Sequence, residues 1–227
     1  MTSILKVDEL QDTSGNLIIK EDSNTITIGA SGDTINVPSG ATFNVQGTAG
    51  TGFTDPGLTH ISSQTVSSGV SSVDFLSSFS STYDNYILYY SDLGVATDNV
   101  DLYMRCASST GTISGSDYVW GISESRSNNG PTGDYSTGAT QFHLTYTNLG
   151  NAATESSGGE IIFFGTQDTT HHKMVKSIIN GMSNGSDADG ARMSGSCKTT
   201  SALVGFTIYA SSGNIDSGKF TLFGVKK

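Results

Sequence analysis

A short repeat in residues 24–46 constrains the fold more than any other feature of the sequence. Three units alternate apolar, polar and apolar residues, and a turn rich in Gly, Ser, Asp or Pro separates successive units: Ile26-Thr27-Ile28, Ile35-Asn36-Val37 and Phe43-Asn44-Val45. Alternation places the apolar side chains on one face of a strand. Because strands this short cannot bury such a face alone, they must stack on other strands. We therefore expect several chains to intertwine as a stalk, whose core consists of Ile26, Ile28, Ile35, Val37, Phe43 and Val45.

The rest of the chain carries longer and more aromatic strand candidates. They lie at residues 86–90, 100–106, 118–122, 141–146, 159–165, 174–179, 202–209 and 220–225, with Gly/Ser/Asn/Asp loops between them. Within 100–106 the apolar residues alternate cleanly, so Val100, Leu102, Met104 and Cys106 should face inward. Only residues 76–83 could form a helical turn. The spacing predicts an all-β protein with a jelly-roll-like antiparallel β-sandwich.

A Gly-rich stretch marks the expected domain boundary. Residues 51–57 contain Gly, Thr, Asp and Pro and read as a linker. We therefore predict an anchor and β-repeat stalk at residues 1–50 and a β-sandwich head at residues 58–227.

Composition and charge exclude several classes of function. The formal net charge is −10 with only eleven Lys and Arg residues, which does not fit nucleic-acid binding. No run of about 20 apolar residues predicts membrane insertion. Residues 1–15 carry several charges and no continuous apolar run, so we expect no signal peptide. A hydrophobic content of 35% argues against disorder over most of the chain.

Candidate metal and redox residues are few. Cys106 and Cys197 lack Cys-x-x-Cys spacing, and either one disulfide or two small buried side chains fits them. The adjacent pair His171-His172 would point to opposite faces of a strand, so it is either an exposed pair or one ligand per chain near an oligomer axis. Residues 184–190 resemble a calcium loop in their oxygen content, but Lys198 stands where an EF-hand needs Glu. We favour a hairpin loop there, and we predict no metal and no cofactor.

Residues 123–140 form the best candidate for a contact loop. This stretch combines Arg126 and Tyr135 with the amides Asn128 and Asn129, and such mixtures can bind sugars or protein surfaces. Trp120 precedes it and is expected to be a core residue at a strand end. The sequence contains no Gly-x-Ser-x-Gly elbow and no phosphate loop, and its carboxylates lie in loop-like contexts rather than as a catalytic pair. We therefore do not expect an enzyme.

Two N-terminal strings resemble a known class of proteins. Ile4 to Asn16 (ILKVDELQDTSGN) and Asn24 to Thr42 resemble the start of tail-fibre and related structural proteins of marine bacteriophages, notably those that infect cyanobacteria. The segments 73–75, 83–86 and 220–224 are similar, more loosely, to the β-domain that often follows. The resemblance implies a homotrimer, mounted on the virion by an N-terminal region that includes Ile4, Leu5, Val7 and Leu10. It implies an outward-pointing head and supplies no catalytic residues.

The combined prediction is a non-enzymatic virion protein that is assembled in the host cytoplasm and released by lysis. As a tail-fibre adhesin it would bind other phage tail or capsid proteins through its N-terminal region. Its head would contact a glycan or protein of the host cell surface. Because the chain is short for a long fibre, a short side fibre, a tail-tip knob and a capsid-surface fibre all remain compatible. The alternatives are a capsid-decoration protein and, third, a glycan depolymerase.

Overall fold

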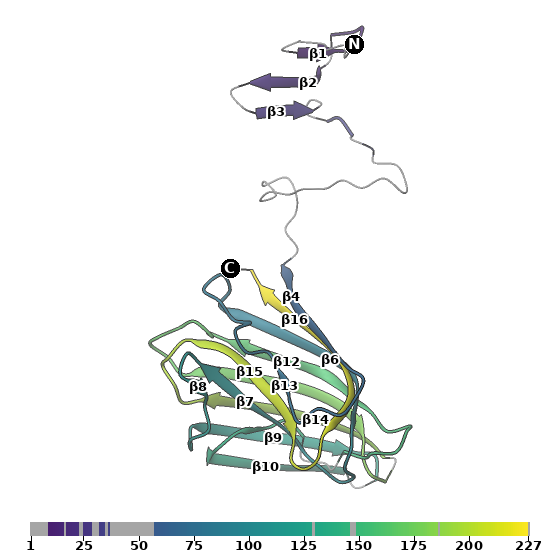
Figure 1. Ribbon diagram of the computed structural model, residues 1–227, viewed down its shortest axis with the longest axis vertical. Helices are drawn as coiled ribbons and strands as arrows, with labels where there is room; N and C mark the ends of the chain where they lie inside the picture. Colours follow the sequence, from purple (N-terminus) through teal and green to yellow (C-terminus); the bar gives the residue numbers. More distant parts are fainter. Residues whose placement is uncertain are drawn as a thin grey trace. The chain divides into compact units, whose positions relative to one another are not determined.

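The computed structural model describes residues 9–15, 17–22, 25–28, 32–34, 36, 57–128, 130–145, 149–185 and 187–226. The chain forms two compact units, Met1–Asp55 and Pro56–Lys227. All regular secondary structure in the described residues is β-strand (Figure 1), which confirms the predicted all-β class. Among these residues no helix has the length and apolar character that crossing a membrane would need.

The N-terminal unit contains an antiparallel meander of three short strands, β1 (Glu9–Gln11), β2 (Leu17–Asp22) and β3 (Thr25–Ile28). The first repeat unit forms β3, whose partner is the upstream strand β2. Its apolar side chains are not covered within the described chain: Ile26 is 68% exposed, and Ile28 and Leu10 are exposed as well. The other predicted stalk and anchor residues, Ile4, Leu5, Val7, Ile35, Val37, Phe43 and Val45, lie outside the described residues.

The second unit contains an eight-stranded antiparallel sheet, here called the large sheet. Its spatial order is β10-β9-β14-β13-β12-β6-β16-β4 (Figure 1). The strands are β4 (Leu58–Val66), β6 (Asn85–Val95), β9 (Tyr118–Arg126), β10 (Gly130–Ala139), β12 (Ser157–Phe164), β13 (Lys173–Met182), β14 (Ala188–Cys197) and β16 (Ile215–Val225). Strands β10 and β4 are therefore its edges.

The small sheet faces the large one and completes an antiparallel sandwich. Its order is β11-β7-β15-β5, and β8 pairs with β7. The strands are β5 (Val73–Asp74), β7 (Leu102–Ser108), β8 (Gly111–Thr112), β11 (Phe142–His143) and β15 (Leu203–Ala210). The chain crosses between the two sheets after β4, β5, β6, β8, β10, β11, β14 and β15, so strands distant in sequence become neighbours within each sheet.

The core lies between the two sheets. The four alternating residues of 100–106 are all buried, as their pattern predicted. Phe206 of the small sheet packs on Phe163 of the large sheet with ring centroids 4.7 Å apart, and Phe79 packs on Phe163 at 5.1 Å. Beside them, Gly205 allows a close backbone approach, since a Cβ there would lie 2.0 Å from the carbonyl oxygen of Phe75.

Several segments differ from the sequence prediction. The expected loop 123–140 is a β-hairpin formed by the end of β9 and the edge strand β10. The segment 188–197, rich in Gly, Ser and Ala, is the internal strand β14. Of the described residues 141–145 only two form a strand, and 76–83 contains turns but no helix. Pairing with well-patterned neighbours places β10 and β14 in the sheet despite their weak intrinsic β-propensity.

Candidate recognition surface

A row of aromatic rings runs across the outer face of the small sheet. In β7 the inward residues alternate with Tyr103 and Arg105, which therefore point away from the core. Tyr103 pairs with His143 on one side and with Tyr209 on the other. The ring centroids of Tyr103 and His143 are 4.4 Å apart, and those of Tyr103 and Tyr209 are 5.8 Å apart. These separations are those of interacting aromatic pairs.

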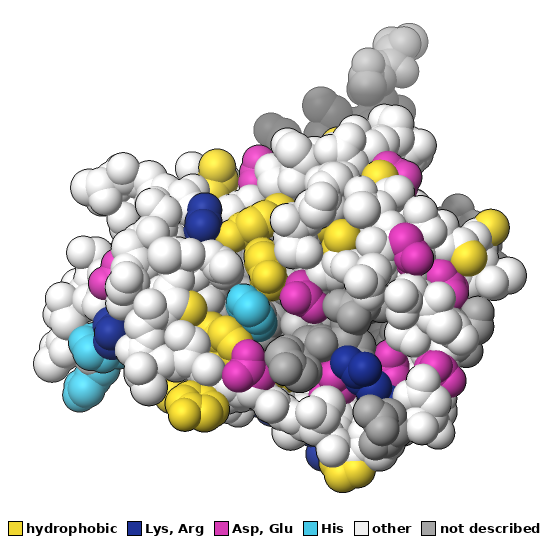
Figure 2. Space-filling view, turned by 90° about the horizontal axis from the view of Figure 1, so that it is seen from below, with side chains coloured by type: hydrophobic (Ala, Val, Ile, Leu, Met, Phe, Trp, Pro, Cys, Tyr) yellow, Lys and Arg dark blue, Asp and Glu magenta, His cyan; other side chains and the backbone are white. Residues whose placement is uncertain are grey.

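Trp120 of the large sheet extends this row at the edge of the small sheet. Its ring stacks on His143 at 4.4 Å, and its Nε1 donates a hydrogen bond to the Gln141 carbonyl oxygen at 3.1 Å. Trp120 is buried, as expected, while His143, which carried no signal in the sequence, lies between two aromatic rings. Figure 2, seen from the side on which β10 lies, shows histidine and hydrophobic side chains on a surface that is mostly white, the colour of the backbone and the remaining side chains.

Arg105 is held beside the aromatic row by neutral partners. Its Nε donates to the Thr140 carbonyl oxygen at 3.0 Å, and its Nη2 donates to Gln141 Oε1 at 3.2 Å. Its guanidinium carbon lies 5.3 Å from the centre of the Tyr209 ring, within cation–π range. Within the described residues no carboxylate pairs with Arg105. Its positive charge is therefore fixed in place and not neutralised by an ion pair there.

A carboxylate lies two strands away in the same cross-strand row. Arg105 pairs with Thr207, and Thr207 pairs with Asp74. The Thr207 hydroxyl donates to one carboxylate oxygen of Asp74, and the Ser72 hydroxyl donates to the other at 3.1 Å. Two hydroxyl donors thus orient the Asp74 carboxylate.

These residues line a hollow of about 410 Å³ on the outer face of the small sheet. The lining is Ser71, Ser72, Asp74, Leu76, Arg105, Thr112, Thr207 and Tyr209. The buried Tyr209 hydroxyl has no hydrogen-bond partner among the described residues. The hollow therefore offers a guanidinium donor, a carboxylate acceptor, hydroxyls and an aromatic edge. Such a combination suits a hydroxyl-rich ligand, because sugars present donors, acceptors and apolar C–H faces together.

Electrostatics fix the charge of this surface near neutral pH. Burial raises the pKa of Tyr209, and burial together with nearby Asp101 raises that of Tyr103, so both hydroxyls stay protonated. Burial lowers the pKa of His143 below its usual value near 6.5, so the imidazole is neutral at pH 7. Arg105 is therefore the cation of the surface, and Asp74 is its opposing charge.

The predicted contact residues do not form one site. Arg126 points toward the buried Glu124, with 3.4 Å between Nη2 and Oε2. The Asn128 amide donates to the Asp187 carboxylate, which ties the β9–β10 turn to the β13–β14 turn. Tyr135 is highly exposed and pairs with Gly121, on the sheet face opposite to Arg126. Asn129 lies outside the described residues.

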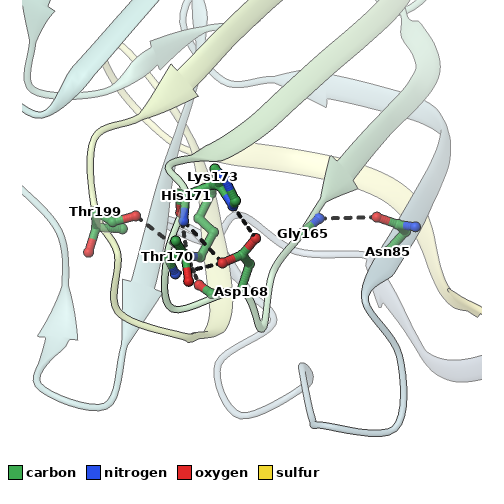
Figure 3. Close-up of polar contacts among 7 residues, drawn as sticks. All are labelled: Asn85, Gly165, Asp168, Thr170, His171, Lys173 and Thr199. Atoms are coloured by element: carbon green, nitrogen blue, oxygen red, sulfur yellow. Dashed lines mark hydrogen bonds and ion pairs between the residues drawn. The ribbon is translucent and has the colours of Figure 1, made fainter.

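The histidine pair lies in a turn before β13, and both rings are exposed, as the sequence indicated. His171 Nδ1 contacts Asp168 Oδ2 at 2.8 Å, and backbone amides of Thr170 and His171 donate to Oδ1 (Figure 3). These hydrogen bonds hold the pKa of Asp168 well below its usual range. The next residue, Lys173, is fully buried, which the sequence did not indicate.

Cys106 and Cys197 meet inside the sandwich. Cys106 lies on the small sheet and Cys197 on the large sheet, both are buried, and each thiol affects the pKa of the other. Interaction with the Cys197 thiol, together with burial, raises the pKa of the Cys106 thiol. The Tyr118 hydroxyl accepts the Cys106 amide proton at 3.0 Å, which fixes the backbone beside the pair.

No group of three or more His, Cys, Asp or Glu side chains that could hold a metal ion occurs among the described residues. Comparisons with protein-family models, curated proteins and solved structures returned no match.

Proposed function

We propose that this chain is a non-enzymatic, homotrimeric virion protein of the tail-fibre type. Its N-terminal region would join it to tail or capsid proteins of the particle. The sandwich would contact the host cell surface through the outer face of the small sheet. This contact surface replaces the 123–140 hairpin as the candidate adhesive site.

One observation carries the proposal: the small sheet gathers a guanidinium, a carboxylate and an aromatic side chain around a hollow on its outer face. Arg105 and Asp74 are oriented by neutral neighbours beside a hollow, and Tyr209 contributes an aromatic side chain to its lining. Oriented polar groups around a concave surface are typical of binding sites.

The N-terminal unit supports the multichain part of the proposal. Its three short strands expose Ile18, Ile19, Ile26 and Ile28 within the described chain. Isolated short-stranded sheets are marginally stable without a covering layer. Further copies of the same segment would supply that layer, as in a fibrous stalk, and three copies would convert weak single contacts into avid attachment.

Immunogold labelling of intact virions tests the location. Labelling at the tail with a few trimers per particle is the expected result. Labelling spread over the capsid would overturn the adhesin proposal in favour of a decoration protein.

An adsorption assay tests the contact surface. Pure full-length protein should block phage adsorption to host cells, and Arg105→Gln should raise the concentration required at least tenfold. Lys198→Gln, which changes an exposed lysine elsewhere, is the matched control and should behave like the unchanged protein. Equal blocking by both variants would remove the small sheet from the contact surface. Release of reducing sugar from host polysaccharide by the pure protein would instead indicate a depolymerase.

A further inference from the structure

We infer that the hollow on the outer face of the small sheet recognises a sugar that carries a carboxylate group, as a uronic acid does. This inference rests on the contact surface proposed above and names the class of ligand that the surface takes. Arg105 would bind the carboxylate of the ligand, and Asp74 would accept hydrogen bonds from its hydroxyl groups. Both side chains line the hollow, whose volume of about 410 Å³ lies within the range of sites that take small molecules.

The guanidinium group of Arg105 has one edge that the protein holds and one edge that stays open. Its Nε donates to the Thr140 carbonyl oxygen, and its Nη2 donates to Gln141 Oε1. A guanidinium group has five N–H donors, and these two contacts use one on each nitrogen. Nη1 therefore keeps both protons, and Nη2 keeps one, without a hydrogen-bond partner in the described chain.

This open edge has the geometry that a carboxylate needs. Two parallel N–H groups on neighbouring nitrogens bind both oxygens of one carboxylate, and such charge-assisted pairs are stronger than hydrogen bonds between neutral groups. The two acceptors and the Tyr209 ring, whose centre lies 5.3 Å from the guanidinium carbon, orient the Arg105 side chain before any ligand binds. Binding then costs less side-chain entropy than it would at a free arginine.

Asp74 calls for hydroxyl donors from the same ligand. Its two carboxylate oxygens accept one hydrogen bond each, from the hydroxyl groups of Thr207 and Ser72. A carboxylate has about four acceptor sites, so about two remain open, and no cation pairs with Asp74 within the described residues. A sugar acid carries a carboxylate and several hydroxyl donors on one ring. An acidic peptide side chain has the carboxylate but no hydroxyl donors beside it.

The spacing of the two charged residues leaves room for a sugar between them. Arg105 pairs with Thr207, and Thr207 pairs with Asp74, so two strand spacings, about 9.6 Å, separate the backbones of the charged residues. A ligand that joins them lies across β15. Tyr209 and the half-exposed Leu76 add apolar surface to the hollow, which suits the C–H groups of a sugar ring.

The acidic character of the whole chain limits which anion the hollow accepts. The net charge of −10 weakens the attraction of anions from a distance, but charges more than about 8 Å away are largely screened at physiological ionic strength. A phosphate monoester would bring a charge of about −1.5 to −2 at pH 7 close to Asp74. A carboxylate brings a single charge, which Arg105 neutralises, and is therefore the better match.

Isothermal titration calorimetry of the full-length protein tests the class of ligand. The probes are methyl glucuronoside and methyl galacturonoside, with methyl glucoside and methyl galactoside as neutral counterparts that carry a hydroxymethyl group in place of the carboxylate. At least one acidic probe should bind at least tenfold more tightly than its counterpart. Equal affinities within both pairs would overturn the inference. Acetyl-aspartyl amide that binds as tightly as the acidic sugars would overturn it in favour of an acidic peptide.

Two arginine variants test the role of the guanidinium fork. Arg105→Lys keeps the positive charge but removes the paired N–H groups, so it should weaken binding of the acidic probe at least tenfold. Arg192→Lys is the matched control, since Arg192 is exposed on β14 of the large sheet, and it should bind like the unchanged protein. Equal affinities of the two variants would overturn the role of Arg105.

The comparison of acidic and neutral probes on the unchanged protein decides the inference even if a variant fails to fold. A protein that blocks phage adsorption but binds none of these probes would overturn the inference and leave the proposed contact surface intact. A protein that binds an acidic probe but does not block adsorption would support the sugar site and overturn its proposed role in attachment.

Discussion

Replacing Lys173 with Met should destabilise the sandwich, because this lysine is a structural cation. Lys173 is the first residue of β13, and its side chain is fully buried. Its ammonium donates to the carbonyl oxygens of Asp168, His171 and Thr199, the last two at 3.1 Å and 3.5 Å (Figure 3). The methionine side chain can fill the same volume but cannot donate to these carbonyls.

The magnitude follows from the contacts that would be lost. Hydrogen bonds to a charged group contribute about 1.5–3 kcal/mol each, and the two shorter ones dominate here. The cost of burying the ammonium offsets part of this gain. Desolvation by burial lowers the pKa of Lys173, which reflects that cost. We therefore expect Lys173→Met to reduce the free energy of unfolding by about 2 kcal/mol, and Tm by about 4–8 °C.

Urea unfolding of the full-length protein at pH 7, followed by tryptophan fluorescence, measures this change, because Trp120 is the only tryptophan. The matched control is Lys198→Met, which removes an exposed lysine. A loss below about 0.5 kcal/mol in Lys173→Met, against an unchanged control, would refute the structural role.

The pH dependence gives a second readout. The pKa of Lys173 is lowered in the folded state. At pH values just below the usual pKa of lysine, the unfolded chain therefore binds more protons than the folded chain does. Stability should therefore gain a contribution from this group as pH rises toward about 10.5. The Lys173→Met variant should lack that contribution, and an identical pH profile in both proteins would contradict the assignment.

Further predictions concern the core and the buried polar groups. Mild oxidation of the full-length protein with diamide should join Cys106 and Cys197 by a disulfide. The mass should then fall by two hydrogens, and the free energy of unfolding should rise by about 4 kcal/mol. An unchanged mass after partial unfolding in the oxidant would show that the thiols do not meet. Gly205→Ala should cost about 2 kcal/mol or more in chemical unfolding, since its Cβ would collide with a backbone carbonyl; a change within 0.5 kcal/mol would show that the backbone adjusts freely. Glu124→Ala should cost about 3 kcal/mol by removing a buried partner of Arg126. Its control is Glu160→Ala, which removes a partly exposed carboxylate, and equal losses in the two variants would contradict a stabilising role of the Glu124–Arg126 pair. Burial raises the pKa of Tyr118, so stability should fall as pH rises above about 10, where the unfolded tyrosine ionises first; a Tyr118→Phe variant with the same alkaline unfolding profile would refute this.

The sequence by itself determined the fold class and the inward-facing residues of one core strand. Alternation in 100–106 predicted which side chains are buried, because a strand with one face in the core must repeat every second residue. The short repeat predicted short strands with one apolar face, and its first unit forms β3, whose Ile26 and Ile28 are exposed within the described residues. Both properties depend on residues that are close together in the sequence, so the sequence pattern alone predicts them.

The tertiary structure decided the sheet edges and the candidate surfaces. The Gly- and Ser-rich segments β10 and β14 carry little strand signal, and long-range pairing with β9 and β13 makes them strands. Likewise, Asp74, Arg105 and Tyr209 are up to 135 residues apart in sequence and meet because β5, β7 and β15 are adjacent in the small sheet. No local sequence pattern predicts that these three residues lie close together, because strand order in an antiparallel sandwich depends on the packing of the whole chain.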